Sequence, residues 1–120
     1  MQLDHIVLLV SSLEASMPYY DALLPLIGFT KKRDHVWGNA DGVFFDFQEA
    51  SDIGEGYKRY GVGLNHLGFT APSREAVDRI AAEMAAAGFE VPERQEIGPG
   101  YALFMKDRDG MRFEITCYEA

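Results

Sequence analysis

Two histidines and two acids occupy matching places in the halves of this 120-residue chain. His5 stands in the run LDHIVL, and His66 stands in the similar run LNHLGF about half the chain later. Asp46 and Glu114 lie in a second pair of similar runs, DGVFFDFQ and DGMRFEIT. Imidazole and carboxylate groups suit divalent ions such as Zn, Ni, Fe(II), Mn or Co. The pattern predicts one metal-capable site that takes donors from both halves.

Each of these residues also has a simpler interpretation. A single histidine in an apolar strand is more often a hydrogen-bonded core residue, and a single acid in a strand is more often on the surface. The duplication favours the metal site, because both halves place a histidine and an acid at equivalent positions.

The elements that carry these residues repeat in the same order. Each half reads as a strand, a helix that ends in Gly-Phe, and three further strands, the last two joined by an Asp-Gly turn. The predicted units are 1–49 and 63–120, with a glycine-containing linker over 50–62. We expect an α+β fold of two tandem βαβββ units, in which the sheets form a curved, partly open mixed-sheet barrel with the helices outside.

The helices are predicted from caps and periodicity. In the first half, Ser11 or Ser12 caps a helix that runs to about Ile27, and Pro18 predicts a late start or a kink. In the second half, Ser73 caps a helix that ends near Gly88. One face of this second helix is apolar, through Val77, Ile80, Ala81 and Met84.

The strands alternate between two faces. The predicted strands after the two helices are 29–35, 36–38, 43–48, 90–97, 101–106 and 111–118. Because side chains alternate with a period of two, Phe45, Phe47, Phe113 and Ile115 share the helix-facing side. The opposite side carries His5, Asp46, His66 and Glu114, which we expect to face a cup.

The composition argues against a nucleic-acid partner, a membrane span and a disulfide. The net charge is −8 and no basic face is present, which argues against a nucleic-acid partner. No apolar run is long enough to span a membrane, and no signal peptide is recognisable, so a cytoplasmic location is the default expectation. The single cysteine, Cys117, excludes an intrachain disulfide and is expected to be a buried thiol.

Together these motifs resemble the vicinal oxygen chelate superfamily, which includes glyoxalase I, extradiol dioxygenases, methylmalonyl-CoA epimerase and the fosfomycin- and bleomycin-resistance proteins. The resemblance covers essentially the whole chain, and also includes the runs YDALL and FMKDRDG. It implies that His5, His66 and Glu114 match metal-ligand positions. The fourth position falls on Asp46, where glyoxalase I-like members carry glutamate, and Gln48 is a second candidate there.

The resemblance implies a metal-dependent lyase or isomerase that acts on a small substrate with adjacent oxygens. Glu114 would combine the roles of ligand and catalytic base, with Asp46 as its counterpart. The alternatives are a metal-free, bleomycin-resistance-like binding protein and a small extradiol-type dioxygenase that uses a two-His, one-carboxylate set. The family also favours a homodimer.

Six further residues are expected around the mouth of the cup as a substrate-binding set. Trp37 either caps the core or stacks on a ligand, and Arg94 and Arg112 either bind an anion or lie at a solvated strand edge. The set is His35, Trp37, Phe44, Arg94, Tyr101 and Arg112.

Overall fold

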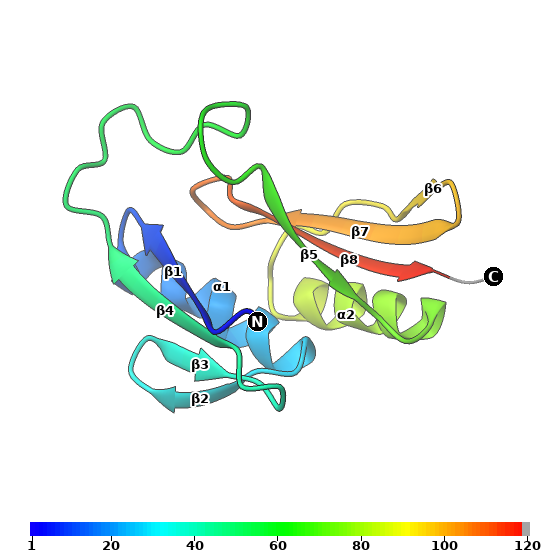
Figure 1. Cartoon of the computed structure of the whole chain (residues 1–120). Helices are drawn as coiled ribbons and strands as arrows, with labels where there is room; N and C mark the ends of the chain where they lie inside the picture. Colours follow the sequence, from blue (N-terminus) through cyan, green and yellow to red (C-terminus); the bar gives the residue numbers. More distant parts are fainter. Residues whose placement is uncertain (119–120) are drawn as a thin grey trace. The chain divides into compact units, whose positions relative to one another are not determined.

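The computed structural model describes residues 1–118, which form two compact units (Figure 1). Unit one is Met1–Gly56, and unit two begins at Tyr57. The predicted linker over 50–62 contains no helix or strand, and it is divided between the two units. No helix within residues 1–118 has the length and apolar character needed to cross a membrane.

Unit one is a four-stranded sheet with one helix, in the strand order β1-β4-β3-β2. The first and last strands, β1 and β4, are parallel neighbours, and the remaining pairs are antiparallel. Its elements are β1 (His5–Val10), α1 (Leu13–Leu26), β2 (Thr30–Arg33), β3 (Val36–Gly38) and β4 (Phe44–Glu49).

Unit two repeats this topology, in the strand order β5-β8-β7-β6. Again the first and last strands are parallel neighbours. The α+β class and the two tandem βαβββ units are therefore confirmed. Its elements are β5 (His66–Thr70), α2 (Arg74–Ala86), β6 (Gln95–Ile97), β7 (Gly100–Lys106) and β8 (Arg112–Tyr118).

Each core lies between the helix and one face of the sheet of its own unit. In unit one, the ring centroids of Tyr20, in α1, and Phe47 are 4.3 Å apart. The rings of Phe45 and Phe29 meet edge-on, with centroids 5.0 Å apart. In unit two, the predicted face of α2 is buried, as are Phe113, Ile115 and the thiol of Cys117. The period-of-two prediction for the core strands is confirmed.

Helix α1 contains Pro18, where the sequence predicts a late start or a kink. The helix begins at Leu13, directly after the Ser12 cap, and continues through Pro18, so the predicted late start was wrong. A proline inside a helix costs about 3 kcal/mol. The buried face that follows offsets this cost, because Tyr20 and Leu23 are fully buried and each large apolar side chain contributes about 1.5–3 kcal/mol.

Two predicted strands are shorter than expected. The predicted strand 90–97 is a strand only over Gln95–Ile97, because Pro92 has no amide hydrogen to donate to a neighbouring strand. The predicted strand 29–35 ends at Arg33, where a tight turn leads into β3. His35 completes that turn with a positive φ of 66°.

The cap of α2 provides a first stability prediction. Ser73 accepts a hydrogen bond from the Ala76 amide at 3.1 Å. Replacing Ser73 with alanine should lower the free energy of unfolding by about 1 kcal/mol, because the amide loses its partner. Urea denaturation measures this change. Ser51→Ala, in the exposed linker, is the control, and an equal loss in both variants would contradict the capping role.

Candidate metal site

In unit two, the imidazole of His66 and the carboxylate of Glu114 lie side by side on the open face of the sheet. The parallel register places His66 opposite Arg112 and Gly68 opposite Glu114. Nε2 of His66 is 3.3 Å from Oε1 of Glu114. The other carboxylate oxygen of Glu114 accepts a hydrogen bond from the Thr116 hydroxyl at 2.5 Å. The predicted histidine and acid of this half are therefore neighbours.

The residue before His66 sets the tautomer of its ring. Asn65 donates from Nδ2 to the carbonyl of Arg59 at 2.9 Å, and this bond fixes the orientation of the amide. The Asn65 Oδ1 atom then lies 2.7 Å from Nδ1 of His66. Because an amide oxygen only accepts hydrogen bonds, Nδ1 must carry the hydrogen.

This tautomer leaves Nε2 of the neutral ring with a lone pair directed at a carboxylate oxygen. Two acceptors 3.3 Å apart are unfavourable unless a proton or a cation lies between them. Metal-binding histidines usually donate the other ring N–H to an oxygen acceptor, as His66 does here. The donor pair in unit two therefore fits a divalent ion.

Unit one has an equivalent histidine with a similar partner. Nδ1 of His5 lies 2.7 Å from Oδ2 of Asp4, the residue that precedes it, as Asn65 precedes His66. Because a carboxylate also accepts hydrogen bonds, the same tautomer is favoured, and Nε2 of His5 keeps its lone pair. In both halves, Nε2 of the histidine therefore keeps the lone pair that could bind a metal.

The acid of unit one differs from its counterpart in unit two. The register places Asp46 opposite Val7, as Glu114 is opposite Gly68. The Asp46 carboxylate accepts a hydrogen bond from Gln48 at 3.2 Å. Over residues 1–118 no hydrogen bond or ion pair joins Asp46 to His5. The side chain of aspartate is also one methylene shorter than that of glutamate.

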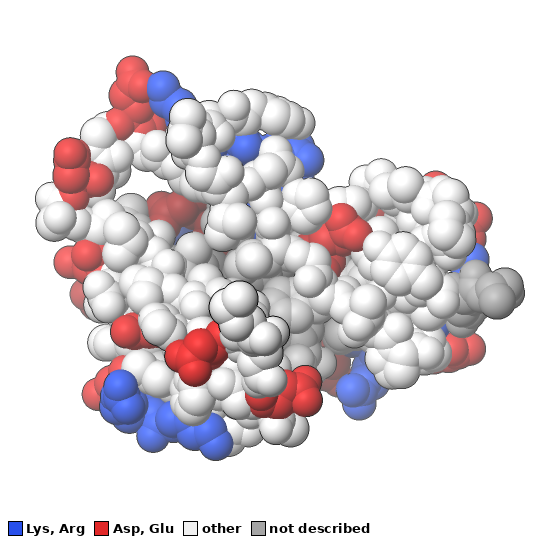
Figure 2. Space-filling view, viewed as in Figure 1, with Lys and Arg blue, Asp and Glu red and all other residues white. Residues whose placement is uncertain are grey.

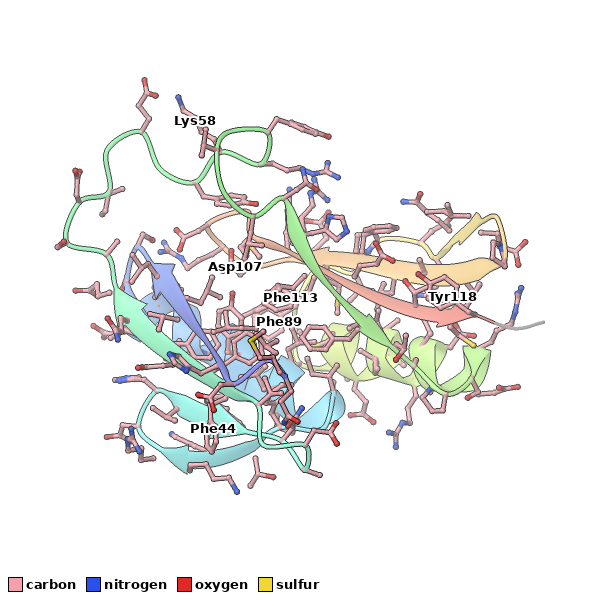
Figure 3. All side chains as sticks on the ribbon, viewed as in Figure 1. Phe44, Lys58, Phe89, Asp107, Phe113 and Tyr118 are labelled. Carbon is pink, nitrogen blue, oxygen red and sulfur yellow. The ribbon has the colours of Figure 1, made fainter. Side chains whose placement is uncertain are left out.

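An open pocket of about 290 Å³ lies beside His5 in unit one. Phe44, labelled in Figure 3, forms part of its wall. The lining residues are Asp4, His5, Arg33, Val36, Phe44 and Asp46. The pocket is thus lined by the predicted metal ligand His5, the predicted acid Asp46, the cation Arg33 and apolar side chains.

Within residues 1–118, neither unit by itself provides the donors of a complete metal site. Over residues 1–118 no three His, Cys, Asp or Glu side chains gather into a group able to hold an ion. Each unit supplies one histidine and one acid, and a typical protein site for these ions needs three or four donors.

Two of the predicted mouth residues lie on the opposite face of the sheet in unit two. Tyr101 lies opposite Cys117 in the register, and its hydroxyl donates to Asp78 of α2 at 2.6 Å. Arg94 pairs with the same carboxylate at 3.1 Å. Alternation puts Tyr101 on the same side as the buried Leu103, so Tyr101 lies on the helix side of the sheet.

Arg94 belongs to this helix-side network and not to the face that carries His66. Its hydrogen bond to Tyr101 and the nearby charge of Asp78 raise the pKa of the Arg94 guanidinium above its ordinary value. The group is therefore a permanent cation with local partners.

The other four mouth residues divide between the two sides. Trp37 is buried, with 5% of its surface exposed, and its register opposite Phe45 puts it on the core side, as the capping interpretation expects. Phe44 and Arg112 lie on the open faces. His35 is half-buried in the β2–β3 turn.

Sequence reasoning missed the two oxygen acceptors and the cation in the pocket. The signal for Asp4 and Asn65 is present, since each directly precedes a histidine. Arg33 could not be found from alternation, because the register between β2 and β3 shifts between Lys31 and Arg33.

Comparison with known proteins agrees with the resemblance seen in the sequence. The family model described as "Glyoxalase/Bleomycin resistance protein/Dioxygenase superfamily" matches residues 2–115. The chain is 32% identical to the uncharacterized protein YqjT of Bacillus subtilis, over 95% of this chain and 97% of that protein.

Solved structures with the same fold include a putative glyoxalase from Bacillus halodurans, with a TM-score of 0.82 and 25% identity over 97% of this chain and 95% of that one. The fosfomycin resistance protein FosX from Listeria monocytogenes matches with a TM-score of 0.72 and 21% identity, over 98% and 93% of the two chains.

Proposed function

Because the chain belongs to the Glyoxalase/Bleomycin resistance protein/Dioxygenase superfamily, we propose that it is a metal-dependent enzyme of the lyase or isomerase type. Its substrate would be a small molecule with two adjacent oxygens. One observation carries this proposal: in both halves, the residue before the histidine accepts a hydrogen bond from Nδ1 and leaves Nε2 free to bind a metal.

In this proposal His5, His66 and Glu114 hold the ion, and Asp46 is the fourth donor, directly or through water. Zn, Ni, Fe(II), Mn and Co all suit imidazole and carboxylate ligands. When bound, the ion supplies Lewis-acid stabilisation of the negative charge that develops on the substrate oxygens, worth several kcal/mol.

Glu114 is the proposed catalytic base. Its carboxylate removes the proton next to the substrate carbonyl and returns it at the neighbouring carbon or the opposite face. The Thr116 hydroxyl orients this carboxylate through the bond to Oε2. Gly68, opposite Glu114, leaves open space, since no atom lies within 4 Å of where its Cβ would be. Asp46 is the counterpart of Glu114 from unit one.

Thermal unfolding of chelator-treated protein with each of the five ions tests the proposal. An ion present at a hundred times its dissociation constant stabilises the folded state by about 2.7 kcal/mol, which raises the melting temperature by several degrees. The double variant His5→Ala with His66→Ala should show no such rise. Stabilisation of wild type and double variant to the same extent would refute the assigned ligands.

A metal-free binding protein is the second candidate, and the exposed apolar side chains on the open face of unit one favour it. Val7 is 47% exposed, Leu9 58% and Phe44 38%. Such a surface binds apolar ligands without any metal. If none of the five ions changes the melting temperature, this candidate replaces the enzyme.

We also propose a homodimer, which the same apolar surface supports. Light scattering should then return twice the chain mass of 13.4 kDa. The expected association is driven by burial of the exposed apolar side chains, so Leu9→Glu should shift the mass toward that of the monomer. A monomer mass for the wild-type protein would refute the dimer.

A further inference from the structure

Strand β2 concentrates positive charge beside the pocket of unit one, in a chain whose net charge is −8. It contains Lys31, Lys32 and Arg33 in succession. Figure 2 shows lysine and arginine gathered at the edge where Figure 1 draws β2. Because β2 is an edge strand, where lysine commonly prevents pairing with another chain, only the placement of each cation can indicate a further role.

An irregularity in β2 directs the cations to different faces. Lys31 lies opposite Trp37, on the core side of the sheet, whereas Arg33 lies opposite Val36, which in turn lies opposite Asp46. Bulges of this kind re-aim side chains. Lys32 also reaches the open face, because its Cε atom lies 3.2 Å from the position that a Cβ on Gly38 would occupy, beside the Phe44 ring.

The cations on the open face have no partner within residues 1–118. No ion pair or hydrogen bond joins Lys32 or Arg33 to a described residue. Lys31, on the other face, differs, because its Nζ atom is 4.0 Å from Oδ1 of Asp34. Both acids of the pocket form their hydrogen bonds with other side chains, since Asp4 accepts from His5 and Asp46 accepts from Gln48. Arg33 therefore lines the pocket without a direct acidic partner among the described residues.

We propose that Arg33, with Lys32 beside it, binds a carboxylate of the substrate, remote from the two adjacent oxygens. Guanidinium groups recognise planar carboxylates with two parallel hydrogen bonds. Strands in a sheet lie about 4.8 Å apart, so β1 and β2, at opposite edges, are about 14 Å apart. The pocket has lining residues on or beside all four strands and a volume of about 290 Å³, which admits a small acid such as a dicarboxylic 2-oxo acid. This inference rests on the proposed function in that the pocket beside His5 receives the substrate.

The test is a titration with 2-oxoglutarate, followed by calorimetry and by amide chemical shifts, in the presence of a chelator. The matched ligand is 2-oxopentanoate, which has a methyl group in place of the distal carboxylate. We expect 2-oxoglutarate to bind more tightly and to shift amides of β2 and β3. Arg33→Gln should weaken its binding about tenfold or more, as expected for the loss of one charge-assisted pair.

Lys31→Gln is the matched control, because it removes the same charge from the same strand on the other face. Its effect on 2-oxoglutarate binding should be less than about twofold. Equal weakening in the two variants, equal binding of the two acids, or binding of inorganic phosphate in place of 2-oxoglutarate would each overturn the proposal. Because the chelator is present throughout, failure of the proposed metal site leaves this result unchanged.

Discussion

Glu114→Gln should lower the affinity for the most stabilising divalent ion by more than about a hundredfold. Substitution of residues that only orient a ligand typically costs 10–100-fold, and Glu114 is proposed as a direct ligand. The glutamine amide keeps the size of the side chain but lacks the negative charge. An NH2 group, which donates hydrogen bonds, replaces one of the two carboxylate oxygens near Nε2 of His66. Competition with a chromogenic chelator measures the affinity.

Glu96→Gln is the control for this substitution. It removes the same charge from unit two, at a surface pair with Arg74, where the two groups are 2.7 Å apart. Metal affinity should stay within about twofold of wild type, because exposed ion pairs have small effects. Wild-type affinity in Glu114→Gln would exclude Glu114 from the site. If the variant, at a metal concentration that saturates it, loses any identified turnover while Asp46→Asn retains it, the role of base belongs to Glu114.

Phe45→Ala should lower the free energy of unfolding by about 3–5 kcal/mol, the usual cost of truncating a buried phenylalanine. Phe45 has no exposed surface, stacks against Phe47 at 5.5 Å and meets Phe29 edge-on. The surrounding strands and helix hold these rings in place, so most of the cavity would remain. Urea denaturation followed by circular dichroism measures the loss.

The neighbouring residue supplies a matched control. Phe44 precedes Phe45 in β4, faces the open side and is 38% exposed. Phe44→Ala should cost less than about 1 kcal/mol, as is usual for surface substitutions. Similar losses for the two variants would contradict the assignment of one core side and one open side to this sheet.

Most of the fold could be predicted from the sequence because the duplication and the two periodicities agree. The period of two placed Phe45 and Phe113 in the cores, and the helical period identified the buried face that includes Met84. The same alternation placed His66 and Glu114 on one face, and the structure brings them within 3.3 Å.

The errors arose where a local feature outweighed the pattern. Tyr101 lies on the helix side because alternation places it with Leu103, two residues later. Arg33 was missed because an irregular register is not visible in a strand of four residues. At Pro18 only the late start was wrong, since burial of the following residues stabilises a helix that begins at Leu13.

The parallel neighbours β1 and β4, and likewise β5 and β8, are the first and last strands that each unit contributes during translation. The histidine of a unit is therefore synthesised early but acquires its acidic neighbour strand only when the end of that unit has left the ribosome. Closing such a long segment is slow compared with forming a helix or a hairpin. A nascent chain should thus complete each helix before it assembles either half of the proposed site.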